Sequence, residues 1–226
     1  MNHLRCVAYI APEMTTVSES FVQQELAAIE AAGWRVLPFA LHDAAYPTGA
    51  SQGLAQRTVV LLRGSRWGQW VSGLWSAAQM GRSLLPALNL LLTDLRVIRW
   101  NVQGSVSLTR CLLIAARMAR ALRQHRCEHI HAHFAHCPAD VAMYAAAMTG
   151  LPFTFTGHAQ DLFRHGPLLG LKAQRARMVL TISHYNRDWL QQQGVPAEKI
   201  DVVRCAPEGG TKALAGYRHQ IGRAHV

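Results

Sequence analysis

Acidic residues are scarce in this sequence of 226 residues: 13 aspartates and glutamates oppose 23 lysines and arginines, which gives a net charge of +10. The deficit is concentrated between residues 63 and 126, where ten arginines accompany a single acid, Asp94. Four of the six tryptophans, at positions 67, 70, 75 and 100, lie in the same stretch. A basic, tryptophan-rich segment indicates an anionic partner, either a membrane surface or a nucleic acid.

Paired cysteine motifs and long apolar runs are also lacking. The five cysteines contain no CxxC pair, which argues against a secreted disulfide framework and favours buried thiols in a reducing cytosol. The longest apolar run, "LLPALNLLL" at 84–92, is far shorter than the roughly 20 residues that a membrane-spanning helix requires. The N-terminal apolar run is too short for a signal peptide, and Glu13 follows it. We therefore predict a cytoplasmic protein.

Strand-like and helix-like segments alternate along most of the chain. Short apolar runs predict strands at 4–11, 34–41, 57–62, 128–134, 151–157, 178–183 and 199–205. Helical periodicity with terminal signals predicts helices at 18–33, 138–150 and 184–194. Because strands joined by helical crossovers pair in parallel, we expect an α/β fold with a Rossmann-like, doubly wound sheet.

A helical insertion interrupts this alternation at about 66–126. Tryptophan, leucine and other apolar residues recur there in steps of three and four residues, which is typical of helices. Pro86 falls inside the pattern and is expected to break or kink the helix.

Four histidines and a cysteine crowd into "HIHAHFAHC", residues 129–137. On a strand, His129, His131 and His133 all point to one face, where imidazoles can bind zinc. His131 and His133, together with Asp161, give one hypothesis: a metal-dependent hydrolase. The alternative is that histidines at the end of a strand line a cleft or precede the next helix. The pattern by itself leaves both open.

Several segments together carry a family resemblance. "IHAHFAHCPADVAMYAAAMTGLPFTFTGHAQDLF" (130–163) resembles family-4 glycosyltransferases of the GT-B fold that act in bacterial exopolysaccharide and capsule synthesis of the colanic-acid type. The opening strand, helix and second strand, and the final "RARMVLTISHYNRDWLQQQGVPAEKIDVVRC" (175–205), are similar to the same enzymes. The resemblance covers about residues 4–205 and is weakest in the middle. It implies the N-terminal, acceptor-side half of a GT-B transferase.

The resemblance also implies a chemistry. Such enzymes transfer a hexosyl group from a nucleotide-sugar donor to a glycan acceptor with retention at the anomeric carbon, and they require no metal or other cofactor. It places His158 near the transferred sugar, with Asp161 orienting His158 or accepting from an acceptor hydroxyl. His131 and His133 would line the cleft. Asp161 also has the position of a helix cap.

Three serines and a glutamate complete the expected cleft. Ser18, Glu19 and Ser20 follow the first strand, where many relatives carry a Gly-Gly loop that approaches a phosphate. Because the first glycine of this sequence is Gly33, we do not expect a phosphate contact through that loop. Ser183 follows a later strand.

The basic insertion has several possible interpretations. If the acceptor is lipid-linked, the insertion would hold the enzyme peripherally on the inner membrane face. The membrane-facing candidates are Trp67, Trp70, Trp75, Arg82, Arg96 and Arg99. Alternatively, the tryptophans and leucines of the insertion belong to the hydrophobic core, and its arginines form a solvent-exposed face. Nucleic acid is not expected, because no recognition motif accompanies the charge. A non-catalytic module that binds a membrane or a protein partner is a further alternative.

The pattern ends after residue 205. Residues 206–226 do not begin a second α/β domain, which a GT-B enzyme uses to bind the donor, and "IGRAHV" resembles translated sequencing-adapter DNA. We expect one domain at 1–205 and a non-native or truncated tail, so that this chain alone is inactive and its full-length parent is the enzyme. The sequence does not name the donor sugar, acceptor or linkage.

Overall fold

The computed structural model describes residues 5–16, 20–44, 52–99, 101–163 and 168–204. The strands are β1 (Cys6–Ala11), β2 (Arg35–Ala40), β3 (Val59–Val60), β4 (His129–His133), β5 (Phe153–Gly157), β6 (Met178–Thr181) and β7 (Ile200–Val202). The α-helices are α1 (Ser20–Ala31), α2 (Gln52–Arg57), α3 (Arg66–Met80), α4 (Leu85–Val97), α5 (Val102–His125), α6 (Cys137–Thr149), α7 (Gln160–Phe163), α8 (Leu168–Arg175) and α9 (His184–Gln192). Two 3₁₀ turns span Gly81–Leu84 and Ala197–Lys199.

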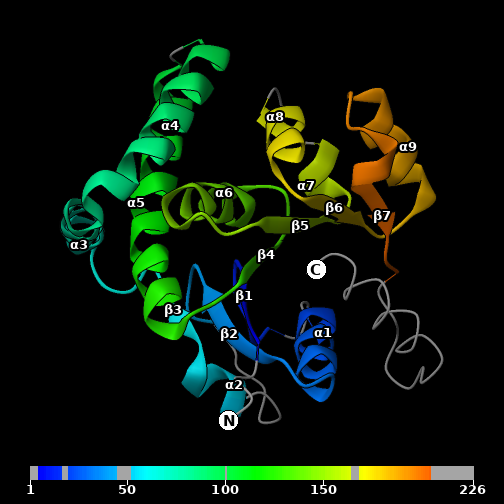
Figure 1. Cartoon of the computed structure of the whole chain (residues 1–226), viewed down its shortest axis with the longest axis horizontal. Helices are drawn as coiled ribbons and strands as arrows, with labels where there is room; N and C mark the ends of the chain where they lie inside the picture. Colours follow the sequence, from blue (N-terminus) through cyan, green and yellow to red (C-terminus); the bar gives the residue numbers. More distant parts are fainter. Residues whose placement is uncertain (1–4, 17–19, 45–51, 100, 164–167, 205–226) are drawn as a thin grey trace.

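The strands form one parallel sheet in the order β3-β2-β1-β4-β5-β6-β7. The chain moves outward from β1 to β3, then returns to the centre and moves outward again from β4 to β7 (Figure 1). The predicted doubly wound, Rossmann-like sheet is therefore confirmed. Its order reverses between β1 and β4, and open α/β sheets bind their ligands beyond the carboxyl ends of the strands at such a switch point.

The two faces of the sheet differ in polarity. Ile10, Ile130 and Phe155 face the main core, which α5 and α6 cover. Tyr9 alternates with Ile10 and faces a smaller core together with Val22 and Leu26 of α1. Because side chains alternate along a strand, the histidines of β4 fall on the same face as Tyr9, under α1. The helix after β1 thus covers the polar part of the sheet.

The helical insertion consists of α3, α4 and α5, on the side of the molecule away from α7 and α9 (Figure 1). Pro86 lies in the first turn of α4, after a 3₁₀ turn, so the predicted break is confirmed. Its missing N–H costs no helical bond there.

Gly73 allows α3 to approach α5, since a Cβ at this position would lie 2.8 Å from Leu113 Cβ. Among the described helices, none combines the length and apolarity needed to span a membrane.

Some local predictions need correction. The strand predicted at 57–62 is only the two residues of β3, because α2 takes up Arg57 and the chain bends after Val60. Helix α8 was not predicted, and its mixture of glycine and basic residues gives little periodic signal. The prediction of buried thiols is confirmed for Cys6, Cys111 and Cys127, which are free and buried. The predicted tail at 206–226 lies outside the described residues.

Candidate functional site at the carboxyl edge of the sheet

The candidate site lies where the chain leaves β4 and β5, beside the start of α1. His133 is the last residue of β4, and His158 follows the last residue of β5. Phe21, in the first turn of α1, contacts both rings, with centroid separations of 5.8 Å to His133 and 4.8 Å to His158. Three elements that are distant in sequence therefore meet at the switch point of the sheet.

His131 belongs to a closed polar ladder between β4 and β5. Its Nδ1 lies 2.7 Å from the hydroxyl of Thr154, and its Nε2 lies 3.1 Å from the hydroxyl of Thr156. His129 contacts the same Thr154 hydroxyl at 2.9 Å. All these side chains are buried. The ladder satisfies the buried polar groups on this face of the sheet. His131 is therefore a buried structural residue next to the site.

His133 lies over a buried carboxylate. Its Nε2 is 3.2 Å from the Oε2 atom of Glu25, which projects from α1, and the Tyr9 hydroxyl donates to Oε1 of the same carboxylate at 2.9 Å. Glu25 and His133 are only 3% and 1% exposed. Neither ring nitrogen of His133 has a hydrogen bond to a described residue. A buried carboxylate needs a compensating charge or donor, and these neighbours supply it.

His158 is enclosed by aromatic rings. Its ring lies 4.7 Å from that of Phe134 and stacks on His133 at 5.8 Å. Its Nε2 atom is buried and has no hydrogen-bond partner among the described residues. Burial, followed by the repulsion of His133, lowers the pKa of His158 from 6.5 to about 4. The imidazole is therefore neutral at pH 7, and a neutral ring has both a donor and an acceptor nitrogen.

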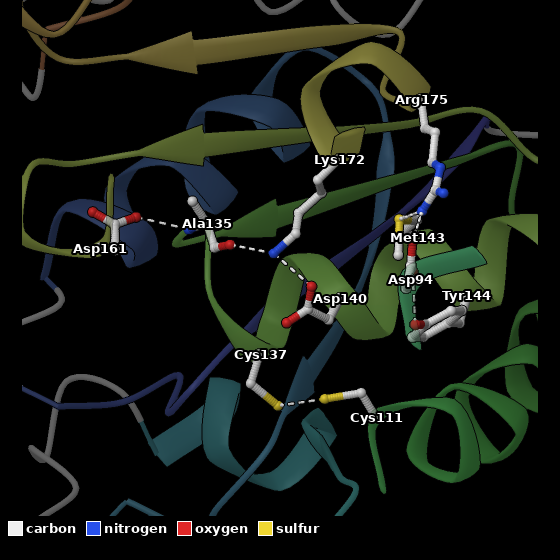
Figure 2. A network of polar contacts seen from close by, with 10 residues as sticks. All are labelled: Asp94, Cys111, Ala135, Cys137, Asp140, Met143, Tyr144, Asp161, Lys172 and Arg175. Carbon is white, nitrogen blue, oxygen red and sulfur yellow. Dashed lines mark hydrogen bonds and ion pairs between the residues drawn. The ribbon is translucent and has the colours of Figure 1, made fainter. Parts of the chain in front are cut away.

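Asp161 holds backbone groups of the loops. Its Oδ2 accepts from the N–H of Ala135 at 2.7 Å, and its Oδ1 accepts from the N–H groups of His158 and Ala159 at 2.9 and 3.0 Å (Figure 2 shows the bond to Ala135). The carboxylate thus joins the loop after β4 to the loop after β5. Of the three roles expected for Asp161, the geometry supports the cap and the orientation of His158, through its backbone.

The remaining predicted cleft residues have different surroundings. Ser183 is the N-cap of α9, where its hydroxyl accepts from the N–H of Asn186 at 3.1 Å. Asn186 in turn donates to the carbonyl oxygen of His158, so the backbone of that histidine is held on both sides. Ser20 is an exposed first residue of α1. Ser18 and Glu19 lie outside the described residues.

A cavity of about 280 Å³ lies along the same edge, at the ends of β2 and β3. Its lining includes Thr15 from the loop after β1, His42 and Asp43 after β2, and Arg63. Arg63 donates to Asp43 at 2.8 Å, and this bond lowers the pKa of the Asp43 carboxyl. The cavity provides polar groups of both signs at this edge of the sheet.

The hydrolase hypothesis requires a different ligand set from the one observed. The ligand atoms of His131, His133 and Glu25 lie within 4.8 Å of one another, whereas Asp161 is not part of this group. Both nitrogens of His131 already contact threonine hydroxyls, and Glu25 accepts from Tyr9. A metal would have to displace these contacts in a buried position, so the residues present fit an internal network better than a zinc site.

Sequence reasoning missed several residues of the site. Glu25 looks like a polar position on a helix, although its place between Val22 and Leu26 on the buried side was a usable signal. Phe21 was predicted only as part of the helix at 18–33. Phe134 gave no signal, because its contact with His158 depends on the conformation of the loop after β4.

The model of Glycosyltransferase Family 4 matches residues 82–206, which is more than half of the chain. The chain belongs to Glycosyltransferase Family 4. The match includes β4 to β7 and therefore His133, His158 and Asp161. A comparison with curated proteins found no match.

Solved structures share the fold of this family-4 chain at low sequence identity. Sucrose-phosphate synthase from Thermosynechococcus elongatus matches with a TM-score of 0.56 and 16% identity, over 98% of this chain and 97% of that one. Anabaena HepE in complex with UDP-glucose matches with a TM-score of 0.52 and 12% identity, over 98% and 50%. UDP-GlcNAc 2-epimerase from Methanocaldococcus jannaschii matches with a TM-score of 0.51 and 9% identity, over 88% and 45%. The family-4 chain spans about half the length of the last two.

The predicted membrane-facing residues of the family-4 chain divide into two groups. Trp67 and Trp75 are 83% and 64% exposed, and Arg82, Arg96 and Arg99 are exposed as well. Trp70 is half-buried and packs against the main core, so the geometry does not support its assignment to a membrane-facing surface.

Proposed function

We propose that this chain is the acceptor-side half of a retaining hexosyltransferase. The enzyme would move a sugar from a nucleotide-sugar donor to a glycan acceptor in cell-surface polysaccharide synthesis. The observation that carries the proposal is the stacked pair His133 and His158 at the switch point. The Nε2 of His158 has no hydrogen-bond partner among the described residues, and the Nε2 of His133 faces the carboxylate of Glu25. Family membership supports the transfer reaction, and the complex of HepE with UDP-glucose supports a nucleotide-sugar donor.

The chemistry of the site suits a sugar hydroxyl. A neutral His158 can accept a hydrogen bond from a hydroxyl or donate one to it, whereas an imidazolium can only donate. Phe21 and Phe134 cover part of the ring, and the lower exposure to water strengthens a polar contact made there. The neighbouring cavity, with Asp43 and Arg63, offers further partners for a glycan acceptor.

Transfer is tested on the polypeptide that the source gene encodes in full, because a GT-B active site lies between two domains. Reading the DNA across codons 205–226 and beyond comes first. Radiolabelled UDP-hexoses are then offered with membrane extracts as acceptors, for the wild type and for His158→Ala. Incorporation that falls at least about tenfold in the variant supports the proposal. Equal incorporation by both would contradict the role of His158, and stoichiometric zinc in the purified protein would revive the hydrolase.

We also propose that α3 contacts an anionic membrane surface, which would bring the enzyme to a lipid-linked acceptor. Trp67, Val71, Leu74 and Trp75 recur at helical spacing and are between 59% and 83% exposed. The only acid between residues 63 and 126, Asp94, is buried and paired with Arg175. An exposed apolar helix face in a segment with ten arginines and one acid favours the interface of a bilayer.

Vesicle co-sedimentation tests the membrane contact. Wild-type protein should pellet with vesicles that contain phosphatidylglycerol and remain in solution with phosphatidylcholine alone. The double variant Trp67→Ala/Trp75→Ala should lose the binding, while the control Tyr185→Ala, which removes an exposed ring from α9, should keep it. Binding that survives the double variant would refute the assignment of α3. If sedimentation shows that the chain dimerises through this face, the partner of α3 is a second copy of the chain and not a membrane.

A further inference from the structure

The loop between β4 and α6 has an unusual backbone. Phe134, its first residue, has a φ angle of 73°, in the left-handed region that bulky side chains rarely adopt. Its ring stacks on His136 at 5.4 Å and lies 4.7 Å from the ring of His158. Such a conformation persists where surrounding contacts impose it. The contacts that impose it here are therefore part of what shapes the site.

Ala135, the residue after Phe134, is held through both of its backbone polar groups (Figure 2). The N–H of Ala135 donates to Asp161, and the carbonyl oxygen of Ala135 accepts from the Nζ of Lys172 at 2.5 Å. Lys172 projects from α8, is 4% exposed, and forms an ion pair with Asp140 at 2.5 Å. Asp140 lies in the first turn of α6, directly after the loop. Lys172 thus joins α8 to both the loop and the helix that follows it.

A second cation on α8 provides an internal comparison. Arg175 donates to Asp94 at 2.7 Å, and the Tyr144 hydroxyl donates to the other oxygen of that carboxylate at 2.8 Å. Figure 2 shows the two arrangements side by side, with Lys172 reaching towards Ala135 and Arg175 reaching towards α4. Both cations lie on α8 and pair with inward carboxylates, Lys172 with Asp140 of α6 and Arg175 with Asp94 of α4. Only Lys172 contacts the loop that carries Phe134.

We propose that Lys172 is a positioning residue for His158, the histidine to which the proposed function assigns the contact with the sugar. By fixing the carbonyl of Ala135 while Asp161 fixes its N–H, Lys172 holds Phe134 in the left-handed conformation that closes its ring over His158. Lys172 itself does not touch the substrate. The expected effect on catalysis rests on the proposed function. The expected effect on the surroundings of His158 rests on the geometry alone.

The catalytic test compares two variants of the full-length enzyme. Lys172→Met is combined with Asp140→Asn, so that no unpaired carboxylate is left in the interior. Arg175→Met combined with Asp94→Asn is the matched control, because Asp94 is buried as well. We expect kcat to fall about 100-fold in the double variant, as for a misplacement of about 1 Å in a catalytic group, and by less than about threefold in the control. If the double variant does not fold, Lys172→Arg, which keeps the charge and changes the reach, replaces it with the same expected direction.

A second readout needs no transfer reaction. The titration of His158 is followed by NMR in the 226-residue chain, where burial holds its pKa at about 4 and the charged or titratable neighbours are Glu25, His133, His136 and Asp161. When Phe134 is released, water reaches the ring. The midpoint should then rise towards 6.5 in the Lys172 variant and stay unchanged in the double variant Arg175→Met/Asp94→Asn.

The outcomes separate the two proposals. A shifted His158 titration without any detectable transfer in the wild type would support the positioning role and reject the transferase. Transfer with an unchanged titration and unchanged kcat in the Lys172 variant would overturn the positioning role alone. Equal effects of the Lys172 and Arg175 variants on both readouts would also overturn it, because they would reflect a general loosening of α8.

Discussion

Replacing Asp161 by alanine should destabilise the chain more than any exposed acid does. The carboxylate accepts three backbone hydrogen bonds, from Ala135, His158 and Ala159, and is 6% exposed. Hydrogen bonds to a charged group contribute about 1.5–3 kcal/mol each, and three that share one carboxylate are not additive. Water entering the space left by the side chain recovers part of the loss. We therefore expect Asp161→Ala to lower the free energy of unfolding by about 3–4 kcal/mol.

Asparagine at the same position should recover only part of this loss. All three partners of Asp161 are N–H donors, so the amide group of asparagine would place its own NH₂ against one of them. Urea unfolding followed by circular dichroism measures both variants on the 226-residue chain. For a domain of this size, about 3 kcal/mol corresponds to a drop in Tm of roughly 10 °C.

The matched control is Asp188→Ala on α9. This carboxylate is 56% exposed and pairs only with the adjacent Arg187, so its removal should change stability by less than about 0.5 kcal/mol. If Asp161→Ala were no more destabilising than Asp188→Ala, the description of Asp161 as the link between the two loops would be wrong. Its carboxylate would then be free for the chemical role that the sequence also suggested.

Three further changes give measurable outcomes. A methyl group in Gly157→Ala would lie 2.4 Å from the side chain of Leu162, so thermal melts should show a loss of about 2 kcal/mol or more, and an unchanged Tm would refute the close packing of α7 on β5. Tyr144→Phe removes the donor to buried Asp94 and should cost about 1–3 kcal/mol in urea unfolding. Because the folded-state pKa of His158 lies below its ordinary value, its contribution to stability is present above pH 6.5 and is lost as the pH falls towards 4. Between pH 7 and pH 5 the wild type should lose about 2 kcal/mol more than His158→Gln, and parallel pH profiles would show that the ring is solvated.

The fold was largely predictable because its signals are local. Buried apolar runs gave six of the strands with small errors at their ends, and Pro86 marked the break in the helical insertion. The length of β3 was not predictable, since its two residues are defined by their pairing with β2. The short helix α8 was missed because tertiary packing of a few apolar residues, rather than periodicity, fixes it.

The candidate site was predicted only in its residue types. The sequence brought His133 and His158 together through a family resemblance, and strand alternation correctly placed His129, His131 and His133 on one face. It could not separate their roles: His131 is closed off by Thr154 and Thr156, whereas His133 meets Glu25 from a helix more than 100 residues earlier. Such distinctions depend on which strands become neighbours.

By itself, the sequence determined that this protein is a parallel α/β domain with a basic helical insertion, because periodicity and charge are properties of neighbouring residues. Only the tertiary structure decided that the carboxylate of Asp161 accepts hydrogen bonds from the backbone and that Lys172 reaches Ala135. It also decided that Trp70 packs against the core while Trp67 and Trp75 are exposed. These arrangements depend on elements that are distant in the chain. Their geometry follows from the order of the strands, which places the ends of β1, β4 and β5 at one edge of the sheet.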